Sequence, residues 1–462
     1  MDKKSEFAYE YKHIAKLVDI KADANKFCEK YKNFLNASKT ERECVKTLKS
    51  LAEYSGYKEF VRDECELTAG DKYYVVNREK CLVLITIGKL PLDAGINFVM
   101  SHIDSPRLDL KPNPVYEDSE ISYFKTHYYG GIRKYQWPVI PLSMHGRIFK
   151  EDGSFVDICY GEKEDEPKFI ISDLLPHLSQ EQDRRSLNEG VKGEELNIII
   201  GSVPIEGVED DFKEPIKANV LKIMNDLFGI KERDFSRAEI EFVPANKATD
   251  IGFDKSLIAA YGQDDKVCAY TSFMAEIENV EPVKTSIAVF TDKEEIGSEG
   301  VSGMVSNYLF DIVEDLAYNA NVLARDIYRN SICISSDVNS AFDPSFPDPF
   351  EKRNASWLNH GIVVSKYTGH RGKVDASDAS AELVYKVTKL LDDKNVIWQI
   401  GELGKVDIGG GGTIAKYVAQ RNVDTIDVGV PVLAMHSPYE ITAKLDIYET
   451  YLAYKAFLLN NN

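Results

Sequence analysis

Two adjacent glutamates, Glu294 and Glu295, follow a short apolar run, Ile287 to Phe290, after three intervening residues. The run is typical of a buried strand, so the glutamates fall in the loop at its carboxyl end. Such a pair suits metal-assisted hydrolysis, because one carboxylate can bind the ion while its neighbour accepts a proton from water. An isolated Glu-Glu pair is more often a solvated turn. The interpretation therefore depends on the other candidates in the chain.

Four further candidates fall at predicted strand ends or in adjoining loops. Imidazole and carboxylate groups, with no cysteine among them, suit zinc, cobalt or manganese in a hydrolytic site. Each candidate alone has a structural explanation; Asp264-Asp265, for example, can simply cap the helix expected over 267–277. Together they predict a metal centre, in which Asp104 can accept the second ring N–H of His102. The four are His102 with Asp104, Asp264, Asp337 and His436.

Alternating strands and helices are expected to position these residues. Apolar periodicity predicts helices within residues 1–60, 305–328 and 381–391, and strands at 73–76, 82–87, 96–101, 332–336 and 423–428. This alternation predicts an α/β fold with a doubly wound mixed sheet flanked by helices. In such folds the functional residues collect at the carboxyl ends of the strands.

The sequence changes character between about 115 and 245, where short alternating segments are separated by Gly, Pro and charged turns. This pattern predicts a mostly-β domain, residues 113–247, inserted into a catalytic domain formed by residues 1–112 and 248–462. Pro106, Pro112 and Pro114 are expected to break any regular element and so to mark the first boundary.

Composition excludes several classes of partner. The chain has 462 residues and a formal net charge of −19, which disfavours nucleic acid and anionic membranes. No apolar run approaches the length of a membrane span, and the N-terminus lacks the pattern of a signal peptide. Seven cysteines without paired spacing indicate reduced thiols. We therefore expect a cytoplasmic protein.

The sequence resembles the aspartyl aminopeptidases and their bacterial relatives over nearly its whole length. The resemblance implies a metalloaminopeptidase, a protease that releases N-terminal residues from short peptides. It further implies two zinc ions per subunit, for which cobalt or manganese can substitute, and an inserted domain that assembles subunits into a homododecamer. The motifs that carry it are Ser101–Pro106, Asp292–Ser298 and Met435–Ser437, with support from Gly409–Ile414 and Pro176–Leu178.

The same resemblance implies a role for each candidate residue. Asp264 bridges the two metals, and Glu294 is the general base for a water that lies between them. Asp104 is a candidate catalytic residue on the His-x-Asp spacing alone, which allows it to support His102. The remaining implied ligands are His102 and Asp337 for one metal and Glu295 and His436 for the other.

Substrate recognition rests on two further residues. His177 matches a region from which relatives reach a neighbouring subunit's active site. It is a candidate for substrate binding or an additional metal ligand, but can equally be a surface histidine. Lys366 matches a lysine of the family's substrate pocket. Acidic-selective relatives have histidines where this chain reads 338–344, so neutral or apolar N-terminal residues are also expected substrates.

Two alternative functions stay open at this point. A related two-metal deacetylase, dipeptidase or carboxypeptidase would share the centre and differ in what holds the ends of the substrate. A catalytically inactive, self-assembling shell protein would keep the fold without the reaction. Gly409 to Gly412 lacks the Lys-Ser/Thr ending of a phosphate-binding loop, so a nucleotide site is not expected.

Overall fold

The computed structural model describes residues 7–207, 209 and 212–459. By their contacts these residues form two compact units. The catalytic unit comprises the chain up to residue 104, residues 248–435 and the chain from residue 440. The inserted unit comprises residues 105–247 and 436–439. In the described part of the chain, no helix combines the length and the apolar character needed to cross a membrane.

The boundary expected after residue 112 falls inside strand β5 (Arg107–Asp118), which belongs wholly to the inserted unit. Pro106 precedes the strand and lies outside any regular element, as expected, but the expectation is wrong for Pro112 and Pro114. Pro112 and Pro114 lie where the pairing of β5 with β6 (Ile121–Tyr129) shifts register, and proline is tolerated at such irregularities because no ladder hydrogen bond is required of it.

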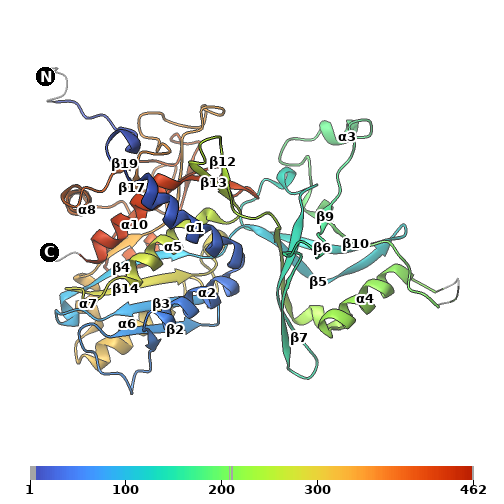
Figure 1. Ribbon diagram of the computed structural model, residues 1–462, viewed down its shortest axis with the longest axis horizontal. Helices are drawn as coiled ribbons and strands as arrows, with labels where there is room; N and C mark the ends of the chain where they lie inside the picture. The colour runs from blue at the N-terminus through green and yellow to red at the C-terminus, as the bar shows by residue number, and fades with distance from the viewer. Residues whose placement is uncertain (1–6, 208, 210–211, 460–462) are drawn as a thin grey trace. The chain divides into compact units, whose positions relative to one another are not determined.

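The catalytic unit is built on a mixed sheet of nine strands among the described residues, in the order β1-β2-β3-β14-β4-β15-β21-β17-β19 (Figure 1). The central strands β14, β4, β15 and β21 run parallel, so their carboxyl ends meet at one edge. The bounds are β1 Lys58–Glu59, β2 Lys72–Asn77, β3 Cys81–Thr86, β14 Thr285–Thr291, β4 Ile96–His102, β15 Ile332–Ser335, β21 Asp424–Gly429, β17 Ile362–Ser365 and β19 Trp398–Ile400.

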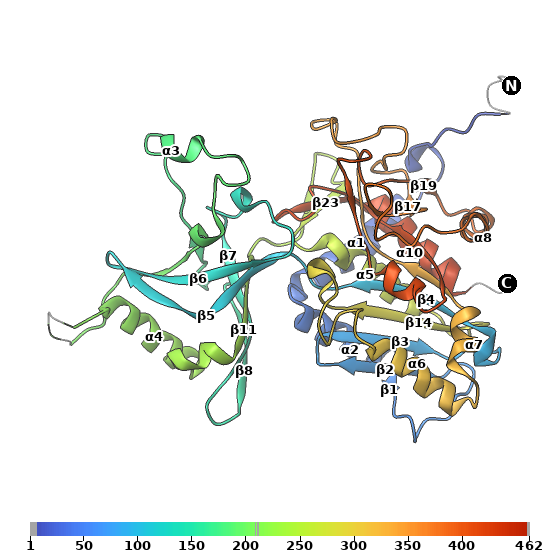
Figure 2. The same ribbon diagram turned by 180° about the vertical axis from the view of Figure 1, so that it is seen from behind.

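Helices cover both faces of this sheet (Figures 1 and 2). In β3, Leu82 and Leu84 pack into a core with α1, α2 and α5, while Val83 and Ile85 pack into another with α6 and α7. Burial of both faces explains why the strand is apolar throughout, and the arrangement confirms the predicted fold class. The helices are α1 Lys21–Ala37, α2 Glu41–Tyr54, α5 Gln263–Ile277, α6 Tyr308–Asn319, α7 Ala324–Arg329, α8 Ala381–Asp393, α9 Ala415–Ala419 and α10 Lys444–Leu458.

Two smaller sheets complete the catalytic unit. One has the order β12-β13-β23-β22-β16, and the other pairs β18 with β20. Their bounds are β12 Thr249–Ile251, β13 Leu257–Ala260, β23 Glu440–Ala443, β22 Pro431–Leu433, β16 Asn339–Ser340, β18 Gly369–His370 and β20 Gly410–Gly411.

The helical periodicity of residues 305–328 belongs to two helices, α6 and α7. The break follows from Asn321, whose φ of 53° lies in the left-handed region that often ends a helix. Periodicity continues across the break because both helices bury apolar residues in the same core, among them Leu316 and Ile327.

The inserted unit has a sheet in the order β8-β7-β11-β5-β6-β10-β9 and a helix, α4 (Pro215–Phe228), packed on β5, β6 and β10 (Figure 2). Helix α4 is absent from the predicted mostly-β pattern, although Ile216, Val220 and Met224 recur at helical spacing and are buried. The remaining bounds are β7 Leu142–Phe149, β8 Phe155–Tyr160, β9 Ile170–Ile171, β10 Ile198–Gly201, β11 Ala238–Pro244 and α3 Gln180–Asp183.

Helix α5 ends in a buried polar cluster around Glu276, which is fully buried. Its Oε1 accepts hydrogen bonds from Thr86 Oγ1 at 2.6 Å and Ser286 Oγ at 3.0 Å. Within the described residues, Glu276 Oε2 and the buried Oδ1 of Asn279 have no hydrogen-bond partner. Burial raises the pKa of Glu276 to about 7, although the hydroxyl donors and Lys72 oppose the shift.

We expect Glu276→Gln to remove a pH dependence of stability between about pH 4.5 and pH 7. In this window the unfolded glutamate is ionised while the folded one keeps its proton. The free energy of unfolding of the unmodified protein therefore falls as pH rises, by roughly 3 kcal/mol in all. Melting temperatures of both proteins from pH 5 to pH 8 test this: the variant should gain relative stability with rising pH. Parallel profiles would contradict it.

Candidate metal centre

Most of the strand-end residues singled out in the sequence meet at the carboxyl edge of the central sheet. His102 is the last residue of β4 and pairs in register with Thr291, the last residue of β14. The turn that carries Glu294 therefore begins beside His102. Asp337 follows the end of β15, the neighbour of β4 on its other side. Parallel strand order thus brings together residues distant in the sequence.

His102 lies at the centre of this group and is 2% exposed. Its Nε2 is 3.1 Å from Asp264 Oδ1, 3.9 Å from Asp337 Oδ1 and 4.0 Å from Glu294 Oε2. Atoms that could bind a metal lie within 4.8 Å of one another in three overlapping sets. These sets are His102, Glu294 and Asp337; His102, Asp264 and Glu295; and Asp264, Asp265 and Asp337.

Asp104 connects the histidine to the glutamate turn. Its carboxylate accepts the backbone N–H of Glu294 at 3.1 Å through Oδ1 and that of Glu295 at 3.2 Å through Oδ2. Oδ1 also lies 3.3 Å from His102 Nδ1. The backbone carbonyl oxygen of Asp104 lies nearer, 3.0 Å from the same ring nitrogen. Asp104 therefore orients the imidazole through its backbone and its side chain, and its carboxylate fixes the backbone of both glutamates, as residues that support metal ligands do.

Asp264 enters the centre because the start of α5 is not helical at Asp264 and Asp265. Its backbone N–H donates to Glu440 Oε2 at 3.0 Å, and its side chain turns to His102 instead of capping the helix. Asp265 Oδ2 accepts the His102 backbone N–H at 3.3 Å, while its buried Oδ1 has no hydrogen-bond partner among the described residues. The sequence predicted a site role for Asp264. It did not predict that Asp265 would contact the backbone of His102.

The electrostatics of the group are those of crowded carboxylates around one imidazole. Burial by itself lowers the pKa of His102, but hydrogen bonds with Asp104 and Asp264 outweigh it and raise the pKa well above its usual range. Burial raises the pKa of Asp337 well above its ordinary value; His102 opposes this, and the charge of Glu294 adds to it. A cation at this place would offset both the burial of these carboxylates and the repulsion between them.

The donor set fits zinc. A buried imidazole nitrogen and several carboxylate oxygens are available, with the imidazole oriented by a carboxylate, and zinc accepts both kinds of ligand. Cobalt and manganese accept the same ligands.

Besides Asp104, three predicted site residues are not among these sets. His436 groups with the inserted unit, where its Nδ1 is 2.9 Å from the carbonyl oxygen of Gly131. Lys366 is exposed directly after β17, and His177 is exposed in the loop between β9 and α3 of the inserted unit. Their roles stay predictions.

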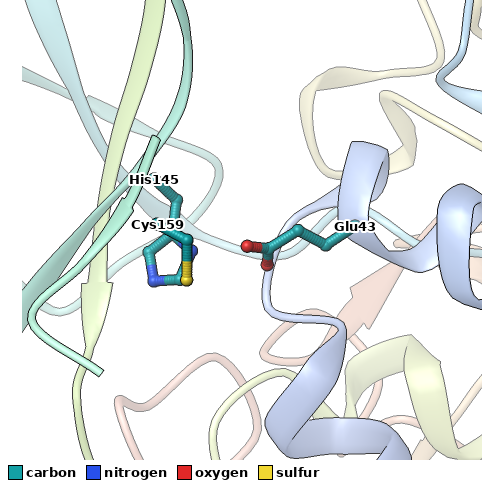
Figure 3. Close-up of side chains that lie close together, drawn as sticks. All are labelled: Glu43, His145 and Cys159. Atoms are coloured by element: carbon teal, nitrogen blue, oxygen red, sulfur yellow. The ribbon is translucent and has the colours of Figure 1, made fainter. Parts of the chain in front are cut away.

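A histidine and a cysteine also adjoin in the inserted unit, on neighbouring strands. His145 of β7 and Cys159 of β8 are cross-strand partners (Figure 3). His145 Nε2 is held by Ser143 Oγ at 3.0 Å and by Glu162 Oε1 at 3.2 Å. Glu43, drawn in the same figure, belongs to the catalytic unit and caps the start of α2 by accepting the backbone N–H of Thr40.

Comparisons with known proteins agree with this fold. Residues 34–458 match the family model described as aminopeptidase I zinc metalloprotease (M18). A probable M18 family aminopeptidase 1 of Clostridium acetobutylicum is 48% identical over 440 residues, covering 94% of either chain. A protein of the same description from Thermotoga maritima is 44% identical over 446 residues, covering 95% of this chain and 96% of the relative.

Solved structures give the same result. The M18 aminopeptidase of Thermotoga maritima superposes with a TM-score of 0.94 at 43% identity, covering 98% of this chain and 99% of that one. Aminopeptidase I of Clostridium acetobutylicum gives a TM-score of 0.92 at 44% identity, covering 98% of this chain and 100% of that one.

Fold, donor set and relatives together define a zinc-dependent peptidase. Within that class the chain belongs to the M18 family and is a metalloaminopeptidase. The predicted enzyme class is confirmed. The comparisons give no support to a deacetylase, a dipeptidase, a carboxypeptidase or an inactive shell protein.

Proposed function

We propose that the enzyme releases N-terminal residues from short peptides, with two zinc ions per subunit and Glu294 as the general base. The observation that carries the proposal is the surroundings of His102. A potential ligand, Asp264, lies 3.1 Å from His102 Nε2, and a potential base, Glu294, lies 4.0 Å from the same nitrogen. Family membership supports zinc as the metal.

The residues that would hold the metals follow from this arrangement and from the family resemblance. Asp264 would be shared by both ions. When bound, zinc lowers the pKa of a water and polarises the scissile carbonyl, which are the two demands of peptide hydrolysis. The other ligands would be His102 and Asp337 for one ion, and Glu295 and His436 for the other.

The chain's own residues then move the proton. Glu294 accepts it from the attacking water at a carboxylate oxygen and delivers it to the nitrogen of the leaving amine as the C–N bond breaks. Asp104 acts as a positioning group, because it fixes the Glu294 backbone N–H at 3.1 Å and so limits how far the base can move.

Substrate preference is proposed to include neutral and apolar N-terminal residues. Lys366 is exposed and can pair with a substrate carboxylate. However, the stretch 338–344 after Asp337 contains no histidine, and Val338 packs against the catalytic core. A stretch without histidine offers no imidazolium to pair with a substrate carboxylate, which favours uncharged substrates over a strict requirement for Asp or Glu.

We also propose that copies of this chain associate through the inserted unit, as a homododecamer. The loop carrying His177 leaves Leu174 and Leu178 exposed by 53% and 67%, a pattern that fits a covered surface. Association would let His177 reach a neighbouring copy's centre. The solved dodecamer of mApe1 from S. cerevisiae shares the fold, with a TM-score of 0.76 at 22% identity.

The proposed location is the cytoplasm. Seven free cysteines fit such a reducing compartment.

The proposed function predicts metal-dependent cleavage of peptides with free N-termini only. Zinc, cobalt or manganese added back to chelator-treated protein should restore release of N-terminal residues from a panel of acidic, neutral and apolar peptides. N-acetylated versions of the same peptides should stay intact, and sedimentation of the same preparation measures its association. Cleavage of the acetylated peptides alone would overturn the proposal, as would protein that binds no metal.

A further inference from the structure

Helix α10 brings a buried tyrosine to the segment that carries Asp337. Tyr454 is fully buried, and its hydroxyl donates to the Val428 carbonyl oxygen at 2.7 Å while accepting a hydrogen bond from Ser336 Oγ. The hydroxyl hydrogen and an oxygen lone pair are thus both used. Ser336 is the residue directly before Asp337. Its backbone N–H donates to the Met100 carbonyl oxygen at 2.7 Å, so this residue is held by both β4 and α10.

The backbone of Gly429, the last residue of β21, packs directly against the backbone of Asp337. A Cβ atom placed on Gly429 would lie 1.7 Å from the carbonyl oxygen of Asp337 and 2.6 Å from its carbonyl carbon. The two backbones are therefore in direct contact, which only glycine allows at this position. On the other side of Asp337, the backbone N–H of Asn339 donates to the Val430 carbonyl oxygen at 2.9 Å.

This restraint matters because Asp337 is a crowded acid. Its carboxylate lies 3.9 Å from His102 Nε2 and shares a set of possible ligand atoms with Asp264 and Asp265. Neighbouring carboxylates repel one another, so an unrestrained segment would move apart whenever no cation is bound. A segment held at Ser336, at Asn339 and on Gly429 keeps the carboxylate in place before the cation arrives, which is preorganisation.

We propose that Tyr454, acting through Ser336, is a positioning residue that holds Asp337 in its metal-binding place. The inference rests on the proposed role of Asp337 as a ligand. It concerns residues outside every motif that carries the chemistry, and it assigns the hydroxyl a role in metal affinity in addition to packing.

Tyr454→Phe tests this because it removes the hydroxyl and keeps the ring. Zinc dissociation constants measured by chelator competition should rise about 10- to 100-fold, the usual effect of losing a group that supports a ligand. Ser336→Ala should do the same. The double variant should be no weaker than the weaker single variant, because both changes break one hydrogen-bond chain.

Tyr328→Phe is the matched control. Tyr328, in α7, is also buried and donates its hydroxyl to a main-chain carbonyl, that of Phe310 at 3.1 Å. Both tyrosine variants should lower the melting temperature, since each removes a buried hydrogen bond to a main-chain carbonyl. Only Tyr454→Phe should weaken zinc binding.

The variant Asp337→Asn distinguishes failure of the proposed ligand role of Asp337 from failure of the positioning role of Tyr454. If Asp337→Asn leaves zinc affinity unchanged, the proposed ligand role fails. A second outcome is that Asp337→Asn weakens zinc binding, whereas Tyr454→Phe and Tyr328→Phe lower the melting temperature equally and leave zinc affinity unchanged. In that case the positioning role fails, and Tyr454 contributes only to the core. Additive losses of zinc affinity in the Ser336→Ala, Tyr454→Phe double variant would also overturn the proposal, because they would show that the two residues do not act through one hydrogen-bond chain.

Discussion

Glu294→Gln is expected to reduce kcat about 10²- to 10⁴-fold while the protein keeps its full zinc content, because general base catalysis contributes that much. The amide matches the carboxylate in shape but accepts no proton at neutral pH. Asp104 still receives the backbone N–H of residue 294, so the turn keeps its conformation. Steady-state kinetics and metal analysis of the same sample measure the two effects.

Two neighbouring glutamates provide controls for this result. Glu295→Gln alters a proposed ligand and should lower zinc content together with activity. Glu299→Gln changes an exposed glutamate on the same loop and should alter neither. Full activity in Glu294→Gln would show that the proton is taken by another group, and loss of zinc from that variant would make Glu294 a ligand.

Asp264→Asn is expected to abolish zinc binding and to reduce kcat/KM on the order of a thousandfold or more, since a metal contributes several kcal/mol to such a reaction. It should also raise the melting temperature of the zinc-free protein. Asp264 lies among buried acids; after burial itself, its negative charge is one of the causes that raise the pKa of Asp265 and of Asp337. A neutral amide relieves that repulsion when no cation is present.

Differential scanning fluorimetry with and without chelator measures the second effect. The unmodified protein should be stabilised by zinc, and Asp264→Asn should respond little to it. Asp424→Asn, an exposed change on β21, is the control and should behave as the unmodified protein. A zinc-free Asp264→Asn protein that melts below the unmodified zinc-free protein would show that Asp264 supports the fold more than the centre.

Local patterns in the sequence were sufficient for most of the catalytic unit. The apolar stretches of β3, β4 and β14 are buried on both faces, so they read as strands without knowledge of their neighbours. Prediction was weaker where a local rule had two outcomes. Pro112 and Pro114 sit in a strand irregularity, Asn321 divides a helical pattern in two, and α4 lies in a region of short alternating segments.

The sequence by itself determined which residues are candidates for the chemistry, because imidazole and carboxylate groups at strand ends are visible in one dimension. Only the tertiary structure decided how they are held. Asp264 is turned by Glu440, 176 positions away, and Asp337 is braced through Ser336 by Tyr454, 118 positions from that serine. Such hydrogen bonds produce no repeating pattern in the sequence, since each joins two single residues that are far apart along the chain. They exist only after the helices have packed on the sheet.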